Sequence, residues 1–398
     1  MTKTVQSPGT RRCAANVALG LAIALLAVGF ATASGQKKTF TVLHAFTGGA
    51  DGGNPYAGLI RDATGNVYGT TYYGGTSGYG TVFMLDKTGK ERAPYSFTGG
   101  SDGANPYAGL VRDASGNLYG TTFHGGSSAC SNGCGVVFKV DKAGKETVLY
   151  SFTGSGGDGA YPVAGLLRDA KGNLYGTTYQ GGASGYGTVF MLDTTGKETV
   201  LFSFTERGGI FPYAGLVQDA AGNLYGTTSG GGNYYGVVYK LDETGEETVL
   251  YKFRGGQDGR DPQYGYLVRD AAGNLYGTTQ YGGTNNFYGM VFMLDETGKE
   301  FALYNFSGGN DGAYPEAGLV RDAAGNLYGT TEGGGASGSG TVFMLDHTGK
   351  ETVLHSFKYS TDGGYPYAGL VRDGNGNLYG TTLDGGDYGY GTVFKVTP

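Results

Sequence analysis

Apolar residues recur along the chain in short runs, each bounded by clusters of Gly and Asp. Within residues 164–204, for example, such runs occupy 164–168, 173–178, 188–192 and 198–204. Short runs rich in Val, Leu, Tyr, Phe and Thr are typical of β-strands. Helical periodicity occurs only near the amino terminus. The middle runs are apolar on both faces, which predicts sheets that are covered on both sides.

This four-run unit occurs seven times. Each copy contains the string Asn-(Leu/Val)-Tyr-Gly-Thr-Thr, which begins at Asn66, Asn117, Asn173, Asn223, Asn274, Asn326 and Asn377. A lone run of the fourth type precedes the first copy at 41–46, and the last copy ends on a run of the third type at 392–396. Pairing these two runs completes seven four-stranded sheets in a closed ring. The sequence therefore predicts an all-β domain over 34–398, a seven-bladed β-propeller with four antiparallel strands per blade.

The connections between runs alternate between short and long. The first and second runs are joined by Asp-x-x-Gly-Asn turns, and the third and fourth by turns such as 194–197. The other two connections, for example 179–186 and 98–107, are long. Because connections in an up-and-down sheet alternate between its two ends, all the long loops are expected on one face of the ring. Binding residues are most often carried by loops, so we expect any functional site on this long-loop face.

Residues 1–33 have the pattern of a signal peptide. Lys3, Arg11 and Arg12 precede an apolar stretch at 17–30, and Ala31-Thr32-Ala33 follows as a small-x-small cleavage site. The stretch is too short to span a bilayer. We therefore expect export to the periplasm or the extracellular medium, by the general or the twin-arginine route.

Composition narrows the possible partners. Aromatic residues make up 13% of the chain, which argues against disorder. The formal charge is −6, and removing the three leader cations makes it −9. Such a chain lacks the basic surface that nucleic acid or anionic lipid requires, so we expect neither partner, and we expect a monomer without membrane insertion. Cys130 and Cys134 remain after cleavage and predict a disulfide, worth roughly 2 kcal/mol for so short a loop.

The repeat itself resembles a known family. Its consensus is Gly-x-x-Asp-Gly-x-x-Pro-x-Ala-Gly-Leu-Val-Arg-Asp-x-x-Gly-Asn-Leu-Tyr-Gly-Thr-Thr followed by Gly-Thr-Val-Phe. It is similar to that of the choice-of-anchor tandem repeat GloVer-containing proteins, over nearly all of the mature chain. The resemblance implies secretion and a bacterial source. It implies no activity and transfers no catalytic residue. The family name refers to an anchor, but this sequence predicts no carboxy-terminal anchor.

Positions that differ between repeats are the candidate binding residues. The two positions after each Gly-Thr-Thr contribute Tyr72, Tyr73, His124, Gln180, Gln280, Tyr281, Glu332 and Asp384. The position after the inter-blade Pro contributes Tyr56, Tyr107, Tyr213, Glu316 and Tyr367. Aromatic faces beside amides and carboxylates suit sugar rings, which are apolar on their faces and polar at their edges. We therefore predict a binding module for extracellular carbohydrate, with ordinary loop variability as the alternative interpretation.

Two other functions remain open. Glu332, Asp384 and Glu316 could supply the carboxyl pair of a glycoside hydrolase, and His124 could act as the base of a polysaccharide lyase. A protein-binding or structural surface role is the third hypothesis.

No cofactor or metal is expected. The recurrent loop aspartates are interpreted as turn caps rather than Ca²⁺ ligands; they are Asp51, Asp102, Asp158, Asp258, Asp311 and Asp362. His44 and His355 replace aromatic residues in the outer strand and are interpreted as packing residues.

Overall fold

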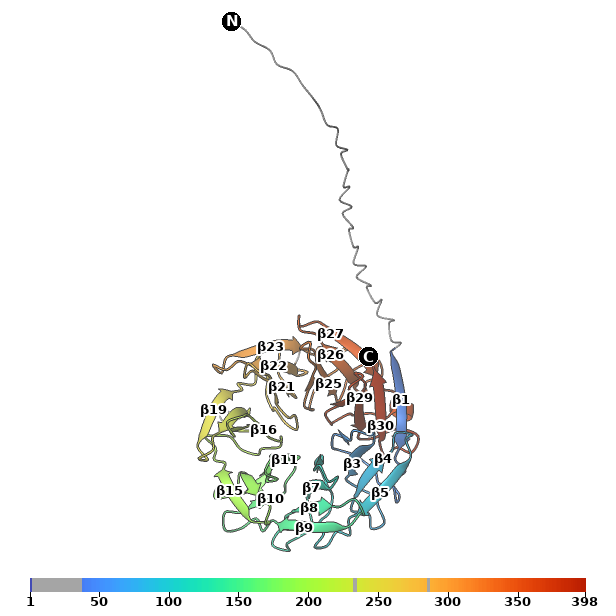
Figure 1. Ribbon diagram of the computed structural model, residues 1–398, viewed down its shortest axis with the longest axis vertical. Helices are drawn as coiled ribbons and strands as arrows, with labels where there is room; N and C mark the ends of the chain where they lie inside the picture. The colour runs from blue at the N-terminus through green and yellow to red at the C-terminus, as the bar shows by residue number, and fades with distance from the viewer. Residues whose placement is uncertain (2–37, 232–234, 285–286) are drawn as a thin grey trace. The chain divides into compact units, whose positions relative to one another are not determined.

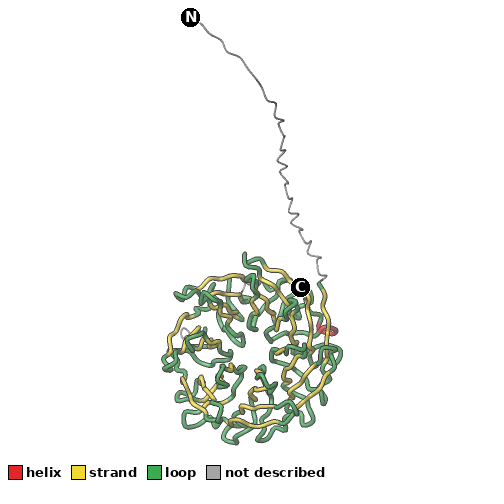
Figure 2. The backbone as a smooth tube through the Cα atoms, viewed as in Figure 1, coloured by secondary structure: helices red, strands yellow, loops and turns green. Residues whose placement is uncertain are grey.

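The computed structural model describes residue 1 and residues 38–398, apart from 232–234 and 285–286. The predicted signal peptide therefore lies outside the described residues. In the described residues, no helix has both the length and the apolar character needed to cross a membrane. The described residues of 38–398 form strands joined by loops, together with one four-residue helix, α1 (Tyr359–Asp362) (Figure 2).

Seven four-stranded antiparallel sheets form a ring, as predicted (Figure 1). The innermost strands of blades 1 to 7 are β2 (Ile60–Arg61), β6 (Val111–Arg112), β11 (Leu167–Arg168), β16 (Val217–Gln218), β20 (Val268–Arg269), β24 (Val320–Arg321) and β28 (Val371–Arg372). The second strands are β3 (Val67–Thr71), β7 (Leu118–Thr122), β12 (Leu174–Thr178), β17 (Leu224–Thr228), β21 (Leu275–Thr279), β25 (Leu327–Thr331) and β29 (Leu378–Thr382).

The third strands are β4 (Thr81–Leu85), β8 (Val136–Val140), β14 (Thr188–Leu192), β18 (Val237–Leu241), β22 (Met290–Leu294), β26 (Thr341–Leu345) and β30 (Thr392–Thr397). The outermost strands are β5 (Glu91–Ser96), β9 (Glu146–Ser151), β15 (Glu198–Ser203), β19 (Glu247–Lys252), β23 (Glu300–Asn305), β27 (Glu351–Ser356) and, for blade 7, β1 (Thr39–Ala45). An additional pair, β10 (Gly159–Ala160) and β13 (Gln180–Gly181), joins two long loops.

The two ends of the domain close the ring. β1 pairs antiparallel with β30, so that Thr41 faces Lys395 and Val42 faces Phe394. The predicted strands 41–46 and 392–396 are thus confirmed with slightly shifted ends. Phe46 lies just beyond β1, where its backbone N–H donates to the Gly391 carbonyl at 3.0 Å.

The innermost strands are shorter than predicted. The run at 164–168 forms a strand only over its last two residues, and the same holds in the other blades. The residues before each strand run beside the axis, where the chains of neighbouring blades come very close. A Cβ at Gly109, for instance, would lie 3.2 Å from the carbonyl oxygen of Gly58. Hydrogen-bond pairing between the innermost and second strands therefore stops where the backbone turns to run along this axis.

The hydrophobic core lies between adjacent blades. Phe97, at the end of the outer strand of blade 1, packs with Leu110 and Phe138 of blade 2, and all three are at most 3% exposed. Burying such a side chain stabilises the fold by about 1.5–3 kcal/mol. Buried threonines also join the blades, since Thr381 Oγ1 donates to Ala57 O at 3.0 Å across the closure.

Aspartates cap the turns, as predicted. Asp113 accepts hydrogen bonds from the backbone N–H of Asn117 at 2.8 Å and from the hydroxyl of Tyr119 at 3.0 Å. Gly116 in this turn has φ 88°, which favours glycine. In the long loop after blade 1, Asp102 accepts from Thr98 N and from the Tyr95 hydroxyl, both at 2.8 Å.

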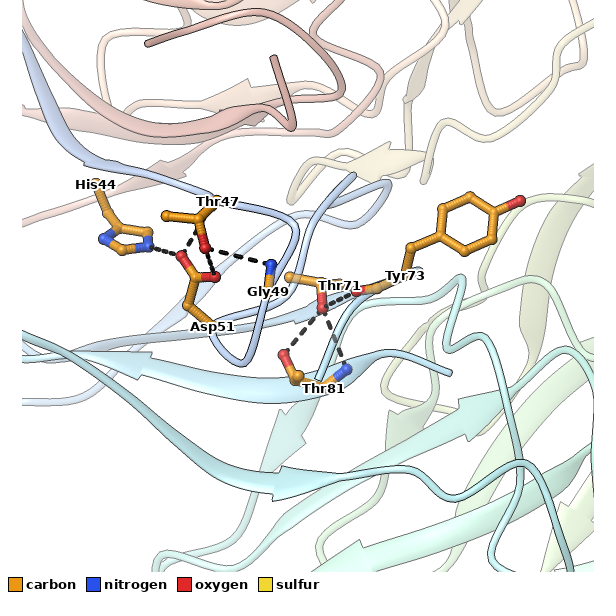
Figure 3. A network of polar contacts seen from close by, with 7 residues as sticks. All are labelled: His44, Thr47, Gly49, Asp51, Thr71, Tyr73 and Thr81. Carbon is orange, nitrogen blue, oxygen red and sulfur yellow. Dashed lines mark hydrogen bonds and ion pairs between the residues drawn. The ribbon is translucent and has the colours of Figure 1, made fainter. Parts of the chain in front are cut away.

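The two outer-strand histidines do more than pack. His44 Nε2 contacts Asp51 Oδ2 at 3.2 Å, in a loop where Asp51 also accepts from Thr47 (Figure 3). His355 contacts Asp362 in the same way at 3.1 Å. Each histidine therefore makes the hydrogen bond that a tyrosine makes in other blades. The prediction that these histidines only pack did not include this bond.

The predicted disulfide is present. Cys130 and Cys134 are joined in the long loop of blade 2, and Cys134 is fully buried. Its sulfur lies beside Gly154 of the following inter-blade loop.

Candidate functional site

An axial cavity of about 260 Å³ lies inside the ring of innermost strands. Six of its lining side chains belong to the position after the inter-blade Pro or its shifted equivalent in blade 5: Tyr56, Tyr107, Val163, Tyr213, Tyr264 and Tyr367. The second predicted column therefore does meet around the axis. The rest of the lining is the Ala-Gly-Leu segment of several blades.

The tyrosines of this column pack against one another. Tyr56 stacks on Tyr107 with 4.6 Å between ring centroids, and Tyr213 lies 5.0 Å from Tyr264. Tyr107 of blade 2 and Tyr264 of blade 5 approach to 6.0 Å across the axis. Burial raises the pKa of Tyr264 to about 12, so it stays a neutral phenol at physiological pH. The rings thus support each other as well as lining the cavity.

Tyr266 is a cavity residue that the sequence analysis missed. It occupies the place of the axial glycine, because blade 5 reads Gly-Tyr-Leu where the other blades read Ala-Gly-Leu. Its side chain reaches past blade 4 to blade 3, with the ring beside Gly215 and the hydroxyl beside Gly165. The signal was available in the sequence as the one large residue in a glycine column.

We expect Gly215→Ala to lower the free energy of unfolding by about 1–3 kcal/mol, because the new Cβ would overlap the Tyr266 ring. Thermal or denaturant unfolding measures this. In a Tyr266→Gly background, which restores the pattern of the other blades, the same substitution should cost much less. Equal costs in both backgrounds would show that Tyr266 does not fill this space.

A groove of about 570 Å³ lies on the long-loop face between blades 1 and 2. Its main side chains are Tyr72, Tyr73, Tyr79, Asn105 and His124, and the rest of its lining is Gly, Ser, Ala and Asn. Tyr73 and Tyr79 are 52% and 44% exposed. No Asp, Glu, Lys or Arg lines it, among the residues that the structure describes. The groove is therefore aromatic, polar and uncharged.

Backbone and threonine contacts hold Tyr73 in place. Tyr73 forms an antiparallel bridge with Gly53 of the preceding inter-blade loop. Thr71 Oγ1 donates to Tyr73 O at 3.0 Å and contacts Thr81 Oγ1 at 2.9 Å (Figure 3). The Tyr73 ring points away from this network in the same view. A rigid backbone thus presents an exposed ring.

His124 closes the other side of the groove. It bridges Ala104 through the backbone, and its Nδ1 lies 3.3 Å from Asn105 Oδ1. Its ring packs against Phe123 at 4.5 Å. Burial lowers the pKa of His124, so the imidazole is neutral at pH 7 and can both donate and accept hydrogen bonds.

A third column of tyrosines was also missed. These residues precede the third strand in most blades. In blades 1, 4, 5 and 7 the ring covers a glycine of the next inter-blade loop, as Tyr79 covers Gly99 and Tyr390 covers Gly48. In blade 2 the position is Cys134, and in blade 6 it is Ser339, where Tyr359 from α1 packs instead. The recurrent Tyr-Gly before the third run was the available signal.

Two of the three predicted acidic residues, Glu316 and Glu332, lie in blade 6 beside the tyrosines of the axial cavity. Glu316 is 2% exposed and accepts a hydrogen bond from Gln280. Glu332 Oε1 accepts from the Tyr367 hydroxyl at 2.9 Å. Burial and then the neighbouring Glu332 carboxylate raise the pKa of Glu316 to about 9.

The remaining predicted residues have other surroundings. Asp384 accepts a hydrogen bond from Asn54 Nδ2 at 2.7 Å. The Arg260 guanidinium lies 4.8 Å from the Tyr281 ring centroid. Gln180 belongs to β13 and pairs with Ala160. No group of three or more His, Cys, Asp or Glu suited to a metal ion occurs within the described part of the chain.

Comparisons with known proteins identify one matching repeat family and several structures with a similar fold. The model of the Gloeobacter/Verrucomicrobia repeat matches residues 29–158, 94–265 and 229–398. A search of curated proteins found no match. The extracellular domain of a putative one-component system from B. thetaiotaomicron is similar, with a TM-score of 0.55, 12% identity, and coverage of 90% of this chain and 40% of that chain.

Two further solved structures are similar. A putative 6-phosphogluconolactonase from Bacteroides uniformis has a TM-score of 0.50 and 14% identity, covering 81% of this chain and 88% of that one. A gluconolactonase from Xanthomonas campestris has a TM-score of 0.45 and 14% identity, covering 71% and 82%. At these identities the likeness concerns the fold alone.

Proposed function

We propose that this chain, which belongs to the Gloeobacter/Verrucomicrobia repeat family, is a secreted module that binds uncharged carbohydrate in the groove between blades 1 and 2. The observation that carries the proposal is the pair of exposed rings, Tyr73 and Tyr79, beside the hydrogen-bonding groups of Asn105 and His124. Export is part of the proposal, and it rests on the predicted leader and the disulfide.

The chemistry of the groove suits a neutral sugar. The apolar face of a pyranose stacks on an aromatic ring, while its hydroxyls need donors and acceptors at the edge. Asn105 and the neutral His124 provide both kinds of group. Because no carboxylate or cation is among the described lining residues, charged sugars such as uronates gain nothing here.

We expect Tyr73→Ala to weaken binding to neutral polysaccharide about five- to tenfold, since an aromatic contact of this kind is worth roughly 1–1.5 kcal/mol. The measurement is a glycan array on the protein without its leader, followed by calorimetry with the best neutral ligand. Tyr107 and Tyr213 are poor choices for this test, because both rings pack inside the axial column.

Tyr388→Ala is the matched control. Tyr388 is 59% exposed in the corresponding long loop of blade 7 and does not line the groove. It should leave binding unchanged. Equal loss in both variants, or no retention of the unmodified protein on any neutral glycan, would refute the proposal.

A further inference from the structure

We propose that the Glu316–Glu332 pair, beside the cavity residue Tyr367, is a binding site for a primary ammonium group. This site lies in blade 6 and shares no residue with the groove between blades 1 and 2, so it can be tested independently of the proposed carbohydrate function. The ammonium group can belong to an amino sugar or to a simple amine.

The hydrogen bonds around the pair leave one position without a donor. Gln263 Nε2 donates to Gln280 Oε1 at 3.2 Å, and Gln280 Nε2 in turn donates to Glu316. The Tyr367 hydroxyl supplies Glu332 Oε1. Glu316 Oε2 is buried and receives no donor from the part of the chain that the structure describes.

Two carboxylate oxygens cannot hydrogen-bond to each other, because both are acceptors. The negative charge of Glu332 adds to the burial of Glu316, so the pair favours a proton or another cation beside the unpartnered Glu316 Oε2. An alkylammonium group carries three N–H donors and a positive charge, so one group can serve both carboxylates.

The surroundings favour an organic cation. Glu316 lies in the column between Tyr264 and Tyr367, whose rings line the axial cavity. Aromatic faces attract ammonium groups and accommodate the attached carbons. Two carboxylates fall well short of the six to eight oxygens that Ca²⁺ requires.

Few other charges face the pair. The titratable and charged groups near it are Tyr107, Tyr264, Tyr281, Tyr367 and, beyond Tyr281, the Arg260–Asp261 pair. The tyrosines are neutral phenols, so none of them can neutralise the carboxylates. The Arg260 guanidinium is directed to Tyr281 and Asp261, at 4.8 Å and 3.9 Å.

The test is calorimetric titration of the protein without its leader at pH 7 with n-butylammonium and with glucosamine. Their neutral counterparts, n-butanol and glucose, are titrated alongside. We expect binding of at least one ammonium ligand and none of its neutral counterpart. Repeating the titration in buffers of different ionisation enthalpy should reveal release of about one proton per ligand, because the ligand displaces the proton that the pair shares.

Glu316→Gln and Glu332→Gln should each weaken ammonium binding at least about tenfold and abolish the proton release, because each removes one charged acceptor. Asp384→Asn is the control, because the Asp384 carboxylate already accepts a hydrogen bond from Asn54. This substitution should leave the ammonium affinity and the proton release unchanged. Binding by glucosamine alone or by butylammonium alone identifies the source of the ammonium group. No ammonium binding, equal binding of the neutral counterparts, or unchanged affinity in both glutamine variants would overturn the proposal.

Discussion

Phe46→Ala should lower the free energy of unfolding by about 3–5 kcal/mol, the cost of emptying a large aromatic site in a core. Phe46 is fully buried although it lies near the amino-terminal end of the domain. It packs with Leu59 and Phe83 of blade 1 and with Val393 of blade 7. Its ring meets the Phe83 ring edge-on at 5.0 Å. Equilibrium denaturation by urea, followed by tyrosine fluorescence, measures the change.

Phe204→Ala is the matched control. Phe204 occupies the same position after β15 of blade 3, far from the closure in sequence, and is also fully buried. A closed ring makes the two positions equivalent, so the two losses should agree within about 1 kcal/mol. A much smaller loss for Phe46→Ala would mean that the amino-terminal strand does not close the ring.

The protein should become less stable as the pH rises from about 4.5 to about 7. Burial raises the pKa of six outer-strand glutamates to about 7; they are Glu91, Glu146, Glu198, Glu247, Glu300 and Glu351. Five of them also lie near an aspartate of the preceding inter-blade loop, which acts in the same direction.

The sign follows from proton binding. Between pH 4.5 and 7 the folded state holds a proton on each such glutamate that the unfolded state has lost, so folding weakens as the pH rises. Each glutamate that keeps its full shift lowers the free energy of unfolding by about 1.4 kcal/mol per pH unit in this window, and partial solvent exposure reduces that slope. The buried histidines His44 and His355 act oppositely, since burial lowers their pKa values and they destabilise the fold below pH 6.5.

Neighbouring glutamates provide the control. Glu247 lies against Gly208 in the preceding inter-blade loop, whereas Glu246 is exposed in the hairpin turn. Glu247→Gln should flatten the pH dependence of the melting temperature between pH 4.5 and 7, and Glu246→Gln should not. A melting temperature that rises steadily through this window in the unmodified protein would contradict the prediction.

The repeat made most of the architecture predictable. Seven copies of a four-run unit, with complementary runs at 41–46 and 392–396, indicated the number of blades, the strand order and the closure. The outer three strands of each blade matched their apolar runs closely because their side chains pack against the neighbouring blades. The innermost strands did not match, since close approach of backbones at the axis, and not side-chain hydrophobicity, decides where pairing ends.

The candidate site was predictable only as a set of positions. Sequence columns correctly placed Tyr56, Tyr107 and Tyr213 at the axis. They could not reveal that Tyr107 and Tyr264, from blades 2 and 5, meet across it. Tyr266 belongs to neither of the two variable positions, the one after Gly-Thr-Thr and the one after the inter-blade Pro.

By itself, then, the sequence determined the fold, because local strand signals repeated at a constant spacing leave only one way to bury both faces of every sheet. Only the tertiary structure decided which loop residues are neighbours. It placed Asp384 beside Asn54, away from Glu316 and Glu332, and it placed Tyr73 and His124 in one groove. These distances depend on how successive blades twist and pack around the axis.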